Sequence, residues 1–188
     1  NPRNTTTFYP YDLSKAKALL TEAGFPNGVG MPEIVLSTTG DYTDLMEYIQ
    51  HDLRKIGLQV RINVLQSPAL REQSAKAQLA VFRKSWLADY ADAENFLTVF
   101  YSPNFCPSGP NYTHYKNADF DALYEQIRVE TNDSIRLQKV AALNALLMED
   151  APVIPLYYDQ VSHFVRSNVH GLQTNPVNML DLRPVHKN

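Results

Sequence analysis

Apolar residues recur along the chain with two different periods, and their order predicts a strand–helix–strand unit over residues 32–65. The stretch 32–38 has three apolar residues in a row, Ile34 to Leu36, and is rich in β-branched residues, as is typical of a strand. After Asp41 the apolar residues lie three or four positions apart, which indicates a helix that ends at Gly57. Residues 58–65 then alternate strictly between apolar and polar side chains. This succession predicts a right-handed crossover between two parallel strands.

The same periodicities extend over the rest of the chain. Four further helices are predicted, over residues 13–23 after the cap Asp12, residues 68–77, a stretch from the cap Asn117 to at least Ile127, and residues 133–150. The first four residues of 79–86 are wholly apolar, which favours a central strand. The stretch 151–165 carries paired strand signals. We therefore predict an α/β fold in which one layer of crossover helices covers a mixed sheet.

Composition and charge narrow the classes of function. A chain of 188 residues with 44% apolar and 20% charged residues fits one soluble globular domain that buries ~70% of its unfolded surface. The net charge is −3 and the lysines and arginines are scattered, so we expect no nucleic-acid partner. No apolar run approaches the ~18 residues of a membrane span. No secretion signal is visible, and we expect any export signal to have been removed.

Asp89, Asp92 and Glu94 are the first candidates for catalysis, because paired carboxylates can hydrolyse glycosides. Such a pair needs one protonated and one ionised acid in different environments. These three lie within six residues of a predicted loop and helix start, where solvent would make them alike. Asp92 and Glu94 also fit the N-terminus of the next helix. The five histidines show no metal-site spacing, and the glycines form no phosphate-binding loop. We therefore expect no enzyme, no metal and no cofactor.

Binding has more support, because aromatic residues are concentrated in the turn-rich stretch 82–115. Aromatic side chains there can form core or can line a ligand cleft with a few polar anchors. Arg83 and Asp89 are the candidate anchors. A short peptide has an ammonium at one end and a carboxylate at the other, so Asp89 would take the first and Arg83 the second. The alternative is that the two side chains form a structural ion pair with each other or with neighbours.

Five blocks of sequence identify a family resemblance. In order they are YPYDLSKAKALLTEAGFPNG, SWLADYADAENFL, YKNADFDALYEQI, DAPVIPLYYDQ and NPVNMLDLRPV. They resemble the family-5 extracellular solute-binding proteins, the peptide, dipeptide and nickel receptors of bacterial ABC importers, from about Tyr9 to Val185. The resemblance implies the second lobe of a type II-like periplasmic binding protein. Residues 1–170 would form this C-terminal lobe and residues 171–188 a tail that returns toward an N-terminal lobe outside this chain.

The resemblance also implies roles for single residues. Asp89 corresponds to the aspartate that holds the α-ammonium of the ligand in the peptide-binding branch. Arg83 matches an arginine that meets ligand carboxylates in some members, and Trp86 an aromatic that lines the side-chain pockets. The remaining residues of the predicted site are Leu87, Ala88 and Tyr90. Family members often have DYPDP where this chain has DYADA, which leaves the stiffness of the loop in doubt.

The function that the resemblance implies is the non-catalytic capture of short peptides for import. The implied partners are a peptide ligand, ABC permease subunits and the N-terminal lobe of the same parent chain. We expect a monomer at the periplasmic or extracellular face of the cytoplasmic membrane, with or without a lipid anchor. Alternatives are another cargo, such as a nickel chelate, an oligosaccharide or an opine, a sensory receptor domain, and an enzyme that uses the carboxylates of residues 89–94.

Overall fold

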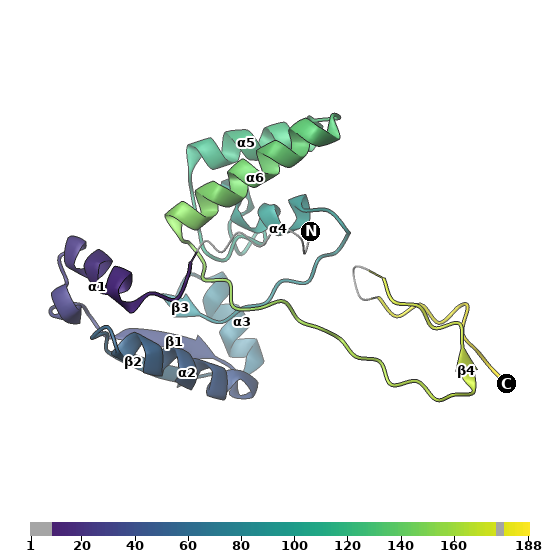
Figure 1. The fold of residues 1–188 in the computed structure, drawn as a ribbon, viewed down its shortest axis with the longest axis horizontal. Coiled ribbons are helices and arrows are strands. Elements are labelled where there is room, and N and C mark those ends of the chain that lie inside the picture. Colours follow the sequence, from purple (N-terminus) through teal and green to yellow (C-terminus); the bar gives the residue numbers. More distant parts are fainter. Residues whose placement is uncertain (1–8, 176–178) are drawn as a thin grey trace. The chain divides into compact units, whose positions relative to one another are not determined.

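The computed structural model describes residues 9–175 and 179–188 (Figure 1). The chain divides into two compact units. The first unit consists of residues 1–85 together with 105–114, and the second consists of residues 86–104 together with 115–188. Each unit has its own hydrophobic core.

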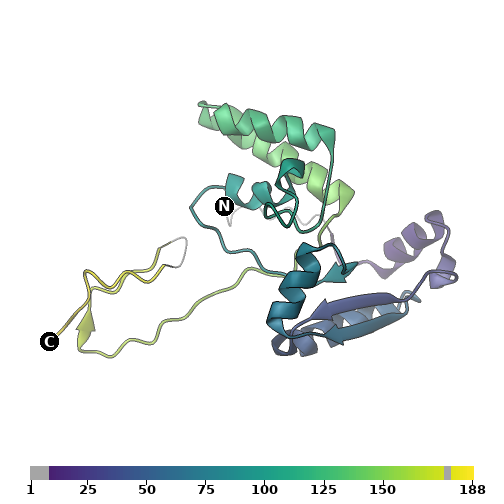
Figure 2. The same cartoon turned by 180° about the vertical axis from the view of Figure 1, so that it is seen from behind.

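The first unit contains the predicted crossover. Strand β1 (Ile34–Thr38), helix α2 (Thr43–Arg54) and strand β2 (Val60–Val64) follow one another, and the two strands pair in parallel with Ile34 opposite Val60. Helix α2 covers one face of the strand pair, as the front and back views show (Figures 1 and 2). The prediction for residues 32–65 is therefore confirmed.

Strand β3 (Val81–Phe82) pairs in parallel with the other side of β1, so the strand order is β2-β1-β3. The central strand of this described sheet is β1, and the prediction that residues 79–86 contain the central strand is wrong. Only two residues pair, and the Val81 side chain is 42% exposed. An apolar run indicates burial but does not specify on which side of a sheet the strand finds its partner.

Two more helices complete the first unit. Helix α1 (Leu13–Glu22) begins at the predicted cap, because Asp12 accepts a hydrogen bond of 2.9 Å from the backbone N–H of Lys15. Helix α3 (Ser67–Ala75) matches the predicted short helix. Asp41 does not cap α2, since it lies in the 3₁₀ turn η2 (Gly40–Tyr42) that precedes the helix.

The core of the first unit lies between α1, α2 and the strands. Its buried members are Leu36, Met46, Ile56, Leu58 and Val60. Gly57 has φ +91°, and a Cβ atom there would lie 2.0 Å from the backbone oxygen of Asn27. The turn after α2 therefore needs glycine both for its left-handed backbone and for space.

The second unit is helical up to Asp150. Its helical elements are α4 (Glu94–Leu97), the 3₁₀ turns η3 (Thr98–Phe100) and η4 (Ser102–Asn104), α5 (Ala118–Val129) and α6 (Asp133–Asp150). Helices α5 and α6 lie side by side in both views (Figures 1 and 2). Asn117 caps α5 as predicted by accepting from the backbone N–H groups of Asp119 and Phe120. Helix α4 packs against α5, which in turn packs against α6, and the three helices share one hydrophobic core.

The prediction of strands over residues 151–165 is wrong, because the structure has no strand there. The strands that follow α6 are β4 (Val169–His170) and β5 (His186–Lys187), which pair antiparallel. The apolar and β-branched residues of the stretch indicate strand propensity, but a strand also needs a neighbour with which to exchange backbone hydrogen bonds. The side chains of Tyr158 and Phe164 are 94% and 99% exposed. The α/β class is confirmed. The predicted mixed sheet is not found among the described residues, because β1, β2 and β3 pair only in parallel and the antiparallel pair of β4 and β5 forms a separate sheet.

Candidate functional site

Asn95 organises the loop that carries most of the predicted site residues. This side chain is 2% exposed, and its Oδ1 accepts hydrogen bonds from the Trp86 indole Nε1–H at 2.9 Å and from the Asp89 backbone N–H at 3.3 Å. One buried amide oxygen therefore ties the Trp86 side chain and the Asp89 backbone to the start of α4.

Asp89 takes part in these contacts through its backbone N–H and not through its carboxylate. Asp89 is exposed, and within the described residues its side chain has neither an ion pair nor a hydrogen bond. Arg83 likewise has no ion pair in that part of the chain. The structural ion pair, which was the alternative explanation for these two charges, is therefore not found among the described residues.

The other predicted residues differ in exposure. The ring of Trp86 is half-buried and tied to Asn95. Leu87 is 71% exposed and Tyr90 is 48% exposed, while Ala88 is half-buried. Arg83 belongs to the first unit, whereas residues 86–90 belong to the second.

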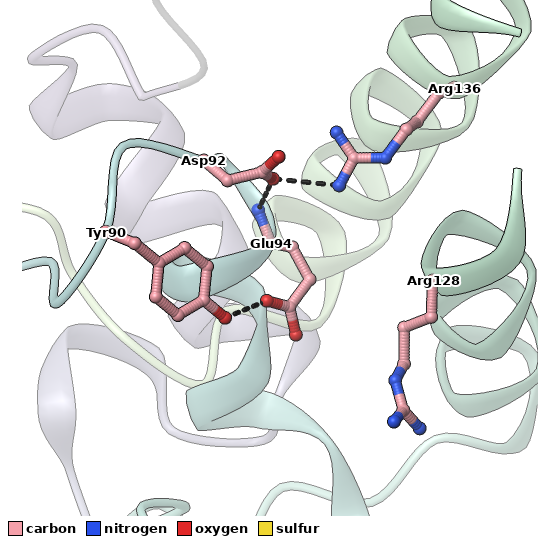
Figure 3. Close-up of a pocket in the computed structure, with 5 residues that line it drawn as sticks. All are labelled: Tyr90, Asp92, Glu94, Arg128 and Arg136. Atoms are coloured by element: carbon pink, nitrogen blue, oxygen red, sulfur yellow. Dashed lines mark hydrogen bonds and ion pairs between the residues drawn. The ribbon is translucent and has the colours of Figure 1, made fainter. Parts of the chain in front are cut away.

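Asp92 has a structural role in the second unit. Its Oδ1 accepts from the Arg136 guanidinium at 2.8 Å and from the Glu94 backbone N–H at 2.8 Å (Figure 3). The hydrogen bond from Arg136 is the main cause that lowers the pKa of Asp92, and the backbone bond acts in the same direction. Asp92 lies at the N-terminus of α4 as predicted, where it accepts from the N–H of the first helical residue, Glu94, but the N-cap residue of that helix is Ala93.

Glu94 binds two phenols. It lies in the first turn of α4, but its side chain accepts from the hydroxyl groups of Tyr90 and Tyr124 and not from a backbone N–H. Burial, followed by the bond to Glu94, raises the pKa of the Tyr124 phenol. The bond to Glu94 also raises the pKa of Tyr90, and a side-chain hydrogen bond with Asn95 opposes that rise. The predicted place of Glu94 at the start of the next helix is confirmed, but its side chain binds the two phenols and does not cap that helix.

These contacts bear on the catalytic alternative. Tyr90, Asp92, Glu94, Arg128 and Arg136 line a cavity of about 380 Å³ in the second unit (Figure 3). A catalytic pair of carboxylates needs one acid that can gain and lose a proton. Asp92 is neutralised by a guanidinium and Glu94 is held by two phenols, so the cavity is lined by charges that already stabilise the fold.

Asn95 and Arg136 are the residues of this site that the sequence did not indicate. Asn95 follows two carboxylates at a helix start, where an amide is common and gives no separate signal. Arg136 lies 44 residues beyond Asp92, and nothing in the sequence pairs them. In the described part of the chain no three histidine, cysteine or acidic side chains form a group that could hold a metal ion. No helix there has the length and apolar character to cross a membrane.

Replacing Asn95 with leucine is expected to lower the free energy of unfolding of the second unit by about 1–3 kcal/mol, because the indole N–H loses its acceptor at a half-buried position. Trp86 is the only tryptophan of the chain, so urea denaturation followed by its fluorescence reports on this unit. The control is Asn144→Leu, the same change at an exposed position of α6, where we expect a change within about 0.5 kcal/mol. Equal midpoints for the two variants would contradict the assigned role of Asn95.

Comparisons with known proteins place this geometry in context. Residues 1–105 match the model of the bacterial extracellular solute-binding proteins, family 5 Middle. The dipeptide-binding protein DppE of Bacillus subtilis is 31% identical over 180 residues, which are 93% of this chain and 32% of that protein. The heme-binding protein A of Haemophilus influenzae is 29% identical over 153 residues, which are 79% of this chain and 28% of that protein.

A solved structure shows the same fold with a ligand. It is the ABC transporter-associated periplasmic binding protein DppA from Helicobacter pylori in complex with the peptide STSA, which is 27% identical to this chain with a TM-score of 0.80. The match covers 98% of this chain and 36% of that protein. This chain therefore spans about a third of the length of the proteins that it matches.

Proposed function

Because the chain belongs to the bacterial extracellular solute-binding proteins, family 5, we propose that the full protein is the substrate-binding component of an ABC importer that captures short peptides without catalysis. The observation that carries this proposal is the state of Asp89. Its carboxylate is exposed and has no ion pair or hydrogen bond among the described residues, while the backbone beneath it is fixed by Asn95.

Such an arrangement suits a ligand ammonium. A positive group that leaves water needs a fixed negative partner, and removing one member of a buried charge pair costs ~3–5 kcal/mol. The contacts of Asn95 hold the loop in advance, so less conformational entropy is lost when the ligand binds. Arg83 is proposed to meet the other terminus of the peptide, since its planar guanidinium matches a carboxylate.

The remaining residues of the proposed site offer apolar and aromatic surface. Leu87 and Tyr90 are largely exposed, and the half-buried Trp86 ring is held by Asn95. With Ala88 between them, these side chains would contact the ligand without polar selection of its side chains. Backbone groups of the peptide would pair with the protein as an added strand does, which makes recognition tolerant of sequence.

The parent protein is proposed to close two lobes around the peptide and then to dock on permease subunits. Residues 1–170 would belong to the C-terminal lobe, and residues 171–188 would return toward the N-terminal lobe. We propose that it acts as a monomer at the periplasmic or extracellular face of the cytoplasmic membrane. The match to a peptide-bound structure and to a dipeptide-binding relative supports peptides as the cargo.

The test is calorimetry of the full-length receptor with a panel of free di-, tri- and tetrapeptides. We expect saturable binding of one peptide per receptor and recovery of intact peptide by mass spectrometry. A related protein is named for heme binding, so heme and a nickel chelate are tested in parallel. Binding of either of these with no heat from any peptide would contradict the proposal, and so would cleavage of the peptide.

A further inference from the structure

Three cations line one pocket of the first unit. Arg71 comes from α3, and Arg83 and Lys84 come from the residues that follow β3. The pocket has a volume of about 230 Å³. Hydroxyl side chains also line it, contributed by Thr39, Ser67, Ser74 and Ser85. No acidic side chain is among the residues that line it.

Aromatic faces hold two of these cations in place. The Cζ atom of Arg83 lies 3.4 Å from the centroid of the Tyr42 ring, and Nζ of Lys84 lies 3.3 Å from the centroid of the Tyr112 ring. A cation over an aromatic ring is attracted by the ring quadrupole. The ring carries no net charge, so it positions the cation and leaves the full positive charge available to an anion.

None of the three cations is compensated by a carboxylate within the described residues, where Arg71, Arg83 and Lys84 form no ion pair. Burial lowers the pKa of Lys84, and the charge of Arg71 lowers it further, while Cys106 acts in the opposite direction. Arg71 and Lys84 are both exposed and line the same pocket. Their charges repel each other, and an anion between them would relieve that repulsion.

We propose that this pocket binds two carboxylates of one ligand, so that the receptor prefers peptides whose last residue is acidic. The inference rests on the proposed function, in which Arg83 holds the terminal carboxylate of the peptide. The acidic side chain then belongs to the same residue and meets Arg71 and Lys84. The pocket has a volume of about 230 Å³, well above the ~10–15 Å³ that a single bound water molecule needs.

The experiment compares two tripeptides that differ only in their last residue, Ala-Ala-Glu and Ala-Ala-Gln, on the full-length receptor by calorimetry. We expect the first to bind about 10-fold or more tightly, as for a charge-assisted hydrogen bond. In Arg71→Gln and in Lys84→Gln this ratio should fall toward one, while the affinity for Ala-Ala-Gln changes by no more than about 3-fold. Far-UV circular dichroism checks that both variants fold.

The matched control is Lys76→Gln, which removes one positive charge from the same unit at a residue that pairs with Glu72 and does not line the pocket. We expect this variant to keep the preference for the acidic peptide. Equal affinities of the unchanged receptor for the two peptides would overturn the inference and leave the proposed function standing. If Arg71→Gln and Lys84→Gln both kept the preference for Ala-Ala-Glu, that result would also overturn the inference. If neither peptide binds, the proposed function fails and the inference fails with it.

Discussion

Replacing Phe120 with alanine is expected to lower the free energy of unfolding of the second unit by about 3–5 kcal/mol. Phe120 is 0% exposed. Its ring meets Tyr115 edge-on at 5.5 Å between centroids and lies parallel to Tyr124 at 6.3 Å. The truncation removes apolar surface from the core and leaves a cavity that the surrounding helices can fill only in part.

The measurement is urea denaturation followed by the fluorescence of Trp86, which belongs to the same unit. The control is Val129→Ala on the same helix α5, at a side chain that is 79% exposed, where we expect a change within about 0.5 kcal/mol. If both variants had the same midpoint, Phe120 would not be the centre of this core. An unchanged slope of free energy against urea would show that the surface exposed on unfolding is the same.

The parts of the fold that were predictable from the sequence are those with local causes. Asp12 and Asn117 satisfy backbone N–H groups within the next three residues, so the start of each helix is decided by neighbouring side chains. The crossover over residues 32–65 is likewise local, because its periodicity changes from strand to helix and back within one continuous stretch.

The predictions that were wrong concern segments whose structure depends on partners distant in sequence. The apolar run at 79–82 predicts a buried strand, but the position of β3 at an edge of the described sheet is decided by pairing with β1. The stretch 151–165 has strand-like composition and no strand, because composition does not specify what the stretch would pair with. Its exposed apolar side chains, such as Phe164, show how little of that pattern is buried in this chain.

The same distinction between local causes and distant partners applies to the candidate site. The position of Asp89 in a loop that follows a strand was predictable, since both features are local. The anchoring of that loop was not, because the amide of Asn95 reaches back to Trp86 across nine residues. Arg136 neutralises Asp92 from a different helix. The sequence thus indicates which carboxylates are present. Only the structure separates Asp89, whose side chain has no partner among residues 9–175 and 179–188, from Asp92 and Glu94, whose side chains are bound within the second unit.

The substitution Asp89→Asn is expected to weaken the binding of a free peptide to the full-length receptor by about 100-fold or more. Loss of one partner from a desolvated charge pair costs ~3–5 kcal/mol, and each 1.4 kcal/mol is about tenfold in affinity. Asparagine keeps the size of the side chain, and only the Asp89 backbone is bound to Asn95. The loop should therefore keep its conformation while the charge is removed.

A ligand change completes the test. N-acetylation removes the ammonium of the peptide, so we expect the acetylated peptide to bind the unchanged receptor weakly and Asp89→Asn to weaken it little further. The coupling between the two changes measures the direct interaction of the ammonium with the Asp89 carboxylate.

The control is Asp119→Asn, which removes an exposed carboxylate in the first turn of α5 and should change affinity by no more than about 2-fold. A strong coupling between Asp89→Asn and N-acetylation would show that the peptide ammonium contacts the Asp89 carboxylate in the bound state. Additive effects would mean that the ammonium binds elsewhere, and the absence of any effect of acetylation would favour a cargo that is not recognised through an amino terminus.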